Sequence, residues 1–480
     1  MEYRTESDSL GNKDVPAEAY YGIQTLRASE NFPITGYKIH RELIISLALV
    51  KEAAARVNMD VGILGERIGN AIVQACQEIQ QGRFHDEIIV DPIQGGAGTS
   101  LNMNINEVIA NCSLEMIGKD KGDYHLIHPN NHVNMGQSTN DVLPTAFRLA
   151  AIRLLDRVIE SFKNLHSTLQ AKAEEFDDVL KMGRTHLQDA IPIRLGQEFS
   201  AYAATVERSI ARFENRRDYL RVVNIGATAV GTGLNADQEY VKKITDKLRE
   251  ISGYDLVQAD NLVDATQNTD VLVDVSTSLK TAVISLSKMA NDLRLMSSGP
   301  RAGFNEIELP SAQPGSSIMP GKVNPVIAEV INQVAFQIQG NDQTIALAAE
   351  AGQLELNVMV PVLVFNLIQS LDILKNAVDV FTQKCIKGIQ ANRGRCSYLV
   401  DRSVGIITAI NPHIGYEEAS RIAKRAIETD RPVRDLILEE GIMTKEELDQ
   451  VLNPYEMTEP GISGRDLMLK KQNMEDAELA

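Results

Sequence analysis

The feature that most constrains the fold is an apolar series that repeats every three or four residues. Its members are Leu272, Val275, Leu279, Ala282, Leu286, Met289, Leu293 and Met296. This spacing is that of a coiled-coil seam, and it predicts one helix of about 25 residues, roughly 37 Å long. Val271, Val273, Val283 and Ile284 make a second face apolar as well. We therefore expect this helix to be buried among others.

Other helical patterns surround this one. The segment from Val326 to Ile345 indicates another long buried helix, and long helical patterns dominate from Asn140 to about Arg395. A further helical run begins at Arg41, whereas residues 1 to about 40 are expected to be irregular. Long helices with several apolar faces favour burial between subunits as well as within one, so we expect an oligomer.

The pattern changes to shorter helices after about Cys396. MTKEELDQVL contains a capping box, with Thr444 at the N-cap and Glu447 three residues later. The predicted fold class is therefore mainly α, with a central bundle of long helices. We expect three domains: an N-terminal domain (1–139), a central helical bundle (140–395) and a small C-terminal helical domain (396–480).

Composition narrows the classes of function. The formal net charge of −17 argues against general binding to nucleic acid or to an anionic membrane surface. The four cysteines include no CxxC pair, which fits a reducing compartment better than a disulfide framework or a zinc site. The polar first residues have no apolar run typical of an export signal, and no run approaches eighteen apolar residues. We expect a cytoplasmic protein.

Two approximate nucleotide motifs are weak. Gly315 to Lys322 resembles a P-loop, but five residues separate its glycines instead of four, and Val323 replaces the required Ser or Thr. GTGLNA, from Gly231 to Ala236, resembles a dinucleotide fingerprint, but we expect no flanking strand–helix unit there.

Three neighbouring histidines, His125, His128 and His132, could suggest a metal cluster. Pro129 and two asparagines interrupt helical register between the last two, and no carboxylate or cysteine joins them at ligand spacing. They are interpreted as hydrogen-bonded or solvated loop residues, and no metal site is predicted.

Four segments place Ser, Thr, Asn or His beside a helix start or interruption: GGAGTSLNMNINEV (95–108), GQSTNDVLPT (136–145), GRTHLQDAIP (183–192) and PGSSIMPGKVNP (314–325). Helix capping explains part of each, since these residues are preferred caps. One cap needs only one side chain, however. Capping therefore does not explain why two or three such residues are adjacent at Thr99-Ser100, Ser138-Thr139-Asn140 and Ser316-Ser317.

The last segment combines several features of an anion site. Asn324 is expected to cap the following helix, and Pro325 suits its first position. Lys322 adds a positive charge at the same N-terminus, where free N–H groups already favour an anion. The residues therefore indicate a site for a small, multiply charged acid with hydroxyl donors around it.

These blocks resemble the signature blocks of the aspartase/fumarase superfamily, and they occur in the family's order. GSSIMPGKVNP is similar to the signature loop, and GGAGTSLNMNINEVIAN, STNDVLPT and GRTHLQDAIP resemble the other blocks. The similarity extends from SLGNKDVPAEAYYGIQTLRASENFPITG to GIITAINPHIGYE and NPYEM. Within the superfamily, the forms of the Thr99-Ser100 and Ser138-Thr139-Asn140 blocks favour the Bacillus-type aspartase branch over the fumarase branch.

The resemblance implies a homotetramer with a central twenty-helix bundle, in which three subunits build each active site. It implies a carbon–nitrogen lyase that converts L-aspartate, a dicarboxylate, reversibly into fumarate and ammonia by anti elimination through an enolate-like carboxylate. No organic cofactor is implied, although some members respond to a divalent metal. Two alternatives remain: a fumarase of the same fold, and a catalytically silent helical scaffold, which the presence of Ser316, Lys322 and His186 disfavours.

Roles carry over from the family to the matching positions. Ser316 matches the general base, and the catalytic set also contains His186 and Lys322. The matches to donors for the β-carboxylate are Thr99, Ser138, Thr139 and Ser317. The matches to binders of the α-carboxylate are Lys322, Asn324 and Thr185, and those around the amino group are Asn140 and His186. Gly315 and Gly321 are expected to allow hinge-like dihedrals in the loop.

Two positions depart from the family pattern. Cys112 stands where related enzymes often have Arg, and Val360 stands where aspartases often have Glu. Neither matches a site residue, so the departures concern local packing, charge or activator response.

Overall fold

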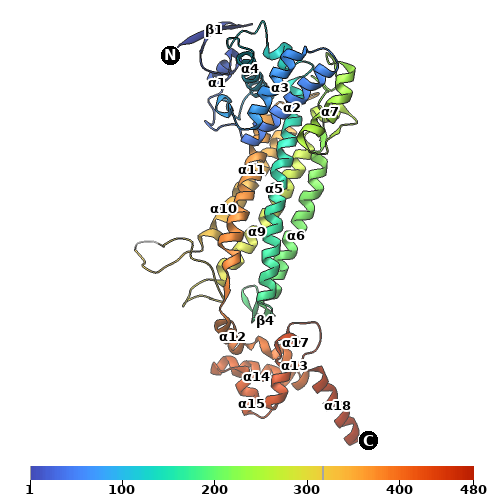
Figure 1. The fold of residues 1–480 in the computed structure, drawn as a ribbon. Coiled ribbons are helices and arrows are strands. Elements are labelled where there is room, and N and C mark those ends of the chain that lie inside the picture. Colours follow the sequence, from blue (N-terminus) through green and yellow to red (C-terminus); the bar gives the residue numbers. More distant parts are fainter. Residues whose placement is uncertain (1, 316–317, 480) are drawn as a thin grey trace. The chain divides into compact units, whose positions relative to one another are not determined.

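The computed structural model describes residues 2–315 and 318–479, and it is predominantly helical (Figure 1). The chain divides into two compact units, each assembled from three separate stretches of sequence. The first unit contains the chain up to Ser161 together with Ser209–Ile284 and Val334–Asn376. The second contains Phe162–Arg208, Ser285–Gln333 and the chain from Ala377 onward. The predicted division into three domains stays a prediction.

Long helices contribute residues to both units. They are α5 (Thr139–Glu175), α6 (Leu195–Leu220), α9 (Asp270–Met296), α10 (Val326–Glu350) and α11 (Val360–Lys384). The predicted seam helix is confirmed as α9, and all eight members of its apolar series are buried. The predicted helix from Val326 is confirmed as α10, which continues past Ile345 to Glu350.

Polar contacts join these helices within each unit. In the first unit, Asp342 of α10 accepts hydrogen bonds from Ser276 at 2.7 Å and Lys280 at 2.5 Å, both on α9. In the second unit, Asn332 of α10 donates to the Ser287 hydroxyl of α9 at 2.8 Å. Buried polar groups must be paired to be tolerated, so such contacts favour one register of neighbouring helices over others.

The remaining elements of the first unit are strands and helices of at most 20 residues. They are β1 (Tyr3–Asp8), β2 (Gly11–Pro16), α1 (Ile23–Asn31), α2 (Arg41–Asp60), α3 (Glu66–Gln80), η1 (His85–Glu87), α4 (Thr99–Met116), η2 (Pro129–Val133), β5 (Val222–Val223), α7 (Gln238–Ser252), β6 (Val257–Gln258) and α8 (Leu262–Gln267). The helix predicted to begin at Arg41 is confirmed as α2, and the side chain of His40 caps it.

The expectation that residues 1–40 are irregular is wrong. β1 and β2 form an antiparallel hairpin, and α1 follows. The guanidinium of Arg4 donates to the carbonyls of Pro16, Ala17, Ala19 and Tyr21. At the start of α1, Glu107 of α4 accepts the N–H groups of Gly22 and Gln24 at 2.8 and 2.9 Å. A carboxylate 85 positions away supplies the cap that the local sequence lacks.

A second correction concerns GTGLNA. Strands β5 and β6 pair in parallel and are joined through α7, so a small strand–helix–strand unit does flank this segment. Each strand has only two residues. Gly231 adopts a φ of 93°, and a Cβ there would lie 2.4 Å from the Cα of Val263. The absence of a side chain at Gly231 therefore allows the backbone at Val263 to pack closely against it.

The second unit carries the β3–β4 hairpin, the antiparallel pair of β7 and β8, which are far apart in sequence, and the C-terminal helices. Its elements are β3 (Leu180–Thr185), β4 (Gln188–Arg194), β7 (Ile307–Glu308), η3 (Ile386–Gly388), β8 (Gln390–Ala391), α12 (Arg393–Arg402), η4 (Val404–Ile406), α13 (Ile407–Ile414), α14 (Tyr416–Thr429), α15 (Val433–Glu439), α16 (Lys445–Val451), α17 (Pro454–Met457) and α18 (Arg465–Leu479). The shorter helices expected after Cys396 are confirmed, and so is the capping box of Thr444 and Glu447 at α16. No helix within the described ranges is both long and apolar enough to cross a membrane.

Candidate active site

The first predicted block forms the start of α4. Gly98 is the N-cap of this helix, with a φ of 91°, and a Cβ there would lie 2.3 Å from the Leu143 side chain. Thr99 follows at the first helical position, where its hydroxyl donates to the Gly96 carbonyl at 2.7 Å. Only glycine fits at position 98, so this position brings the exposed Thr99 end of α4 close to α5.

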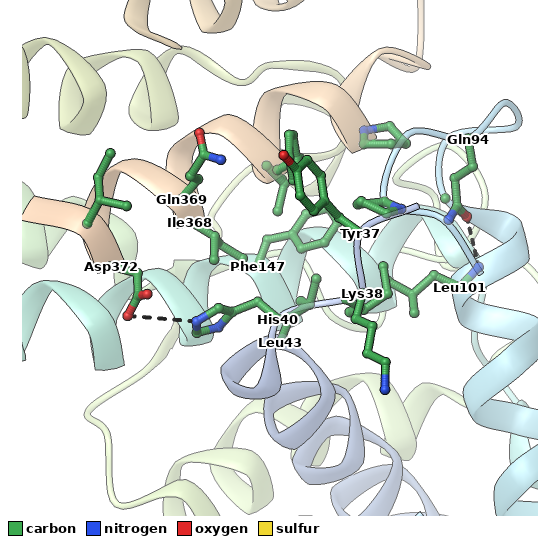
Figure 2. A pocket seen from close by; sticks show the side chains of 17 residues that line it. Tyr37, Lys38, His40, Leu43, Gln94, Leu101, Phe147, Ile368, Gln369 and Asp372 are labelled. Atoms are coloured by element: carbon green, nitrogen blue, oxygen red, sulfur yellow. Dashed lines mark hydrogen bonds and ion pairs between the residues drawn. The ribbon is translucent and has the colours of Figure 1, made fainter. Parts of the chain in front are cut away.

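An apolar cavity of about 220 Å³ adjoins this block in the first unit (Figure 2). Gln94 lines it and accepts the Leu101 N–H at 2.9 Å, which satisfies one of the free N–H groups in the first turn of α4. At another part of the cavity, His40 faces Asp372, with 3.9 Å between Nε2 and Oδ1. Of the predicted site residues within the described ranges, none lines this cavity.

The second predicted block forms the start of α5. Ser138 precedes the first helical residue, and its hydroxyl accepts the Asn140 N–H at 3.2 Å. Asp141 accepts the Ser138 N–H at 2.9 Å in return. The capping expected for this segment is therefore present. Ser138 and Asp141 provide the capping hydrogen bonds. The hydroxyl of Thr139 and the amide of Asn140 take no part in the cap.

A buried polar network lies beneath this start of α5. The amide of Asn102 donates to Thr139 Oγ1 and to Asn134 Oδ1, both at 3.2 Å. The ammonium of Lys51, which is completely buried, donates to Asn134 at 2.7 Å and to Gln137 at 3.0 Å. These contacts connect α2, α4 and the residues before α5, and they hold the Ser138–Asn140 segment from below.

A further set of contacts holds the same segment from the side. Asp141 Oδ2 accepts the N–H groups of Gly226 and Thr228 at 3.1 and 3.0 Å. The amide of Asn140 donates to the Ala229 carbonyl at 2.7 Å. The loop after β5 is therefore fastened to the start of α5 by two consecutive side chains.

Burial shifts the pKa values of both charged groups in this region. It raises the pKa of Asp141 to about 6, although backbone N–H donors and Lys51 favour the ionised form. It lowers the pKa of Lys51 to about 7, although Asp141 favours the charged form. Both shifts arise because the charged forms lose contact with water. Neither residue was identified from the sequence.

Thr139 and Asn140 line a small cavity of about 20 Å³ with Ala97, the residue before the α4 N-cap. Val360 also lines this cavity, at the first position of α11. The departure from the family's Glu at position 360 therefore concerns a residue beside the second block. Cys112, the other departure, is buried in α4, and burial raises the pKa of its thiol.

The third predicted block forms the β3–β4 hairpin of the second unit. Thr185 ends β3, and a two-residue turn of His186 and Leu187 leads to Gln188 of β4. His186 and Leu187 have φ values of 54° and 59°, the conformation of a type I′ turn. Such turns favour Asn and Gly, so a turn with two residues that carry larger side chains is unusual.

The fourth predicted block is the loop before α10. Gly321 has a φ of 85°, in the left-handed region that favours glycine, and its role as a hinge stays a prediction. Gly315 serves a different purpose from the one expected, because a Cβ there would lie 1.8 Å from the Lys322 carbonyl oxygen. The two ends of the loop thus touch at Gly315 and Lys322. Ser316 and Ser317 lie outside the described residues.

The start of α10 differs by one residue from the expectation. The helix begins at Val326, and the Pro325 carbonyl accepts the first helical hydrogen bond, from Glu329 at 3.1 Å. Pro325 therefore occupies the capping position instead of the first helical position, and Asn324 precedes it. Lys322 and Asn324 still lie within four residues of the helix start, where N–H groups and the helix dipole favour an anion.

The structure therefore groups the predicted site residues into two sets. Thr99, Ser138, Thr139 and Asn140 come together at the starts of α4 and α5 in the first unit. Thr185, His186, Lys322 and Asn324 belong to the second unit. The capping spacing between Ser138 and Asp141 could have identified Asp141, since an acidic residue three positions after a serine is a helix-start signal. No local pattern identifies Lys51.

The three histidines before α5 have structural partners. His128 Nδ1 accepts the N–H groups of Asn130 and Asn131 at 3.0 and 3.3 Å, and so caps the π-helix η2. His132 Nδ1 accepts the His128 N–H at 2.8 Å. His125 forms a contact with Asp123. These contacts fit the interpretation of hydrogen-bonded residues, but His132 lies within η2 and not in a loop.

Comparisons with known proteins show similarity over a range that contains all four blocks. A family model described as Lyase matches residues 11–340, and one described as Fumarase C C-terminus matches residues 406–459. A relative from Bacillus subtilis (strain 168), named aspartate ammonia-lyase, is 63% identical over 98% of this chain and 99% of its own length. A relative of the same name from Escherichia coli (strain K12) is 46% identical over 96% of this chain and 97% of its own length.

Solved structures show the same fold. A "fumarate lyase:delta crystallin" from Brucella melitensis bound to cobalt is 47% identical, with a TM-score of 0.93 and coverage of 96% of this chain and 100% of that one. A class II fumarase from Schistosoma mansoni is 35% identical, with a TM-score of 0.90 and the same coverage. The Lyase model covers more than half of the chain, and the relatives match nearly all of it. The chain therefore belongs to the lyase family that contains the aspartate ammonia-lyases.

Proposed function

We propose that this chain is an aspartate ammonia-lyase, which converts L-aspartate reversibly into fumarate and ammonia. The observation that carries this proposal is the set of relatives of that name, which are 46–63% identical over at least 95% of the chain. The fumarase of known structure is less similar, at 35% identity. The substrate class is accordingly a small dicarboxylate.

The difficult step is removal of a proton from the carbon next to the β-carboxylate. The product of that step is a doubly charged, enolate-like carboxylate, and donors fixed in advance around it lower the barrier. We assign Thr99, Ser138 and Thr139 to this carboxylate, together with Ser317. The network beneath α5 supports the assignment of Ser138 and Thr139, because it holds these two residues before substrate arrives.

The opposite end of the substrate needs positive charge and directional donors. We assign Lys322, Asn324 and Thr185 to the α-carboxylate, because an ammonium attracts a carboxylate and an amide orients it. Asn140 and His186 are assigned to the region of the amino group.

Ser316 is assigned as the general base. A serine acts as a base only when its oxyanion is stabilised. The N–H groups at a helix start and the positive charge of Lys322 are suited to stabilising an oxyanion. We assign no organic cofactor to this reaction.

We further propose that the active site is completed between subunits of a homotetramer. Apolar side chains on the long helices support this, since Ile284 and Leu347 of the first unit are 50% and 53% exposed in the single chain. Large exposed apolar residues on long helices are typical of surfaces that pack in an oligomer. The cysteine pattern supports a cytoplasmic location.

The test of the function is an assay of purified protein with L-aspartate and L-malate in separate reactions, followed by the ultraviolet absorbance of fumarate. Fumarate from L-aspartate with release of ammonia supports the proposal. Fumarate from L-malate alone would establish a fumarase, and no fumarate from either would leave the scaffold alternative.

Subunit assembly has its own test. A Thr139→Val variant and a Ser316→Ala variant are expected to be inactive alone and to regain part of the activity when unfolded together and refolded as mixed tetramers. Activity returns only if residues 139 and 316 of one active site come from different chains. Sedimentation analysis of the wild type checks the tetramer itself.

A further inference from the structure

A buried ionic cluster lies at the base of the hairpin that presents Thr185 and His186. It consists of Lys181 and Arg184 of β3, Glu198 of α6 and Glu306 beside β7, all in the second unit. Arg184 Nη1 lies 2.8 Å from Glu306 Oε1, and Lys181 Nζ lies 3.4 Å from Glu306 Oε2. Lys181 also lies 2.9 Å from Glu198 Oε1. Two positive and two negative groups thus balance one another, with Lys181 and Glu306 buried and Arg184 and Glu198 partly exposed.

Glu306 is a fixed point in this cluster. It is completely buried, and its backbone makes three hydrogen bonds to two other segments. Its N–H donates to the Met296 carbonyl at the end of α9 at 2.8 Å. Its carbonyl accepts the Asn392 N–H at 2.9 Å and the Cys396 thiol at 3.4 Å. The side chain of Glu306 therefore extends from backbone that is fastened to α9 and to the start of α12.

Arg184 immediately precedes Thr185, so its contact with the fixed Glu306 side chain also restrains the backbone at the turn. Its guanidinium lies 4.1 Å from the centre of the Phe304 ring, so it is held by stacking as well as by Glu306. Gly183 produces an irregularity in the β3–β4 register, and a Cβ there would lie 2.6 Å from the Ile191 carbonyl. A register irregularity of this kind re-aims the side chains that follow it.

The turn needs such support. His186 and Leu187 both have positive φ values, which residues other than glycine adopt at a cost. Backbone in this conformation persists where the surrounding structure over-determines it. Leu187 is 66% exposed, so the apolar side chain at the tip contributes little to holding the turn. The ion pair of Arg184 and Glu306 is a direct polar link from the residue beside Thr185 to the buried interior.

We propose that Arg184 and Glu306 are positioning residues for the lyase reaction, and that their ion pair sets where Thr185 and His186 meet the substrate. This inference rests on the proposed function. Glu198 shares Lys181 with Glu306 but does not contact Arg184, so it belongs to the cluster without holding the turn.

This difference provides a matched pair of variants. Glu306→Gln keeps the shape of the side chain and removes the charge that holds Arg184, whereas Glu198→Gln removes the other carboxylate of the cluster. We expect Glu306→Gln to lower kcat/KM for L-aspartate at least tenfold and to speed amide hydrogen exchange in residues 183–190. We expect Glu198→Gln to lower the melting temperature while kcat/KM stays within about twofold of wild type. Equal losses of kcat/KM in the two variants, or none in Glu306→Gln, would overturn the proposal.

A second variant keeps the proposal testable if Glu306→Gln does not fold. Arg184→Lys retains the charge, but an ammonium lacks the planar fork that both bonds Glu306 and stacks on Phe304. We expect at least a tenfold loss of kcat/KM, and a wild-type value in a folded Arg184→Lys variant would overturn the proposal.

A double variant tests whether the two residues act as one. If the ion pair between Arg184 and Glu306 is what positions the turn, Arg184→Gln combined with Glu306→Gln should lose no more kcat/KM than the worse single variant. Losses that multiply would show independent roles and overturn the proposal. If the proposed function itself were wrong, the wild-type protein would not release fumarate from L-aspartate. That result can be distinguished from every outcome named for the variants.

Discussion

Asp141 and Ser138 cap the start of α5 together: Asp141 Oδ1 accepts the Ser138 N–H at 2.9 Å, while the Ser138 hydroxyl accepts the Asn140 N–H at 3.2 Å. The other oxygen of Asp141 holds the loop after β5 through Gly226 and Thr228. One buried carboxylate therefore fixes a helix start, a loop and the backbone of Ser138, one of the residues assigned to the substrate.

We expect Asp141→Asn to lose stability and activity together. The amide nitrogen of Asn cannot accept a hydrogen bond, so some of the three backbone N–H groups are left unsatisfied at about 1–3 kcal/mol each. Chemical denaturation measures the stability, and kcat/KM for L-aspartate measures the activity. The exposed Asp264→Asn, in α8, is the control and should resemble wild type. An Asp141→Asn variant with wild-type activity would mean that the cap does not position the donors.

Lys322→Met should weaken binding of the substrate. A hydrogen bond to a charged group contributes about 1.5–3 kcal/mol, so KM for L-aspartate is expected to rise between about tenfold and a hundredfold. Steady-state kinetics provide the measurement. Lys424→Met removes another exposed ammonium of the second unit and should leave KM unchanged. Equal KM values in both variants would remove Lys322 from the α-carboxylate site.

Ser316→Ala should abolish turnover while the oligomer remains folded, because alanine cannot take the proton. Its neighbour provides the comparison: Ser317→Ala removes a single donor to the developing charge, which costs about a hundredfold to a thousandfold in kcat. The release of fumarate is measured for both, with sedimentation to check assembly. Activity near wild type in Ser316→Ala would assign the base to another group.

Stability at acid pH should depend on Glu42 of α2. Burial raises its pKa, but hydrogen bonds from Arg153 and Arg157 outweigh this and the net pKa is lowered. A lowered folded-state pKa means that the contribution of Glu42 is complete above the unfolded pKa of about 4.3 and is lost as pH falls through the lower, folded value. Glu42→Gln should lose stability of about 1–3 kcal/mol at neutral pH and less at pH 3.

Denaturant midpoints between pH 3 and pH 7 measure this dependence. Glu428→Gln, at an exposed position of α14, is the control and should follow the wild-type curve. If the difference between wild type and Glu42→Gln were the same at every pH, ionisation of Glu42 would not contribute to stability.

The capping box of α16 allows a simpler test in the second unit. Thr444→Ala removes the hydroxyl that accepts the Glu447 N–H and should cost about 1 kcal/mol. Thr444→Ser keeps the hydroxyl and should lose much less. Thermal denaturation followed by circular dichroism compares them, and identical melting temperatures for Ala and Ser would show that the box does not contribute.

The sequence alone determined the features that depend on neighbours along the chain. The seam of α9, the start of α2 and the capping box of α16 were all predicted, because helix periodicity and capping use contacts three or four residues apart. The Gly, Ser, Thr and Asn blocks were recognised for the same reason, since their spacing around helix starts is local. The chemistry proposed for these blocks comes from the family resemblance.

Only the tertiary structure decided features that depend on residues far apart in the chain. The hairpin of β1 and β2 and helix α1 escaped prediction, because Arg4 and Glu107 supply their hydrogen-bond partners across long stretches of sequence. Lys51 beneath the second block and Glu306 beneath Arg184 carry no local signal either. A buried charge is tolerated only where distant groups converge on it, and that convergence exists only once the chain has folded.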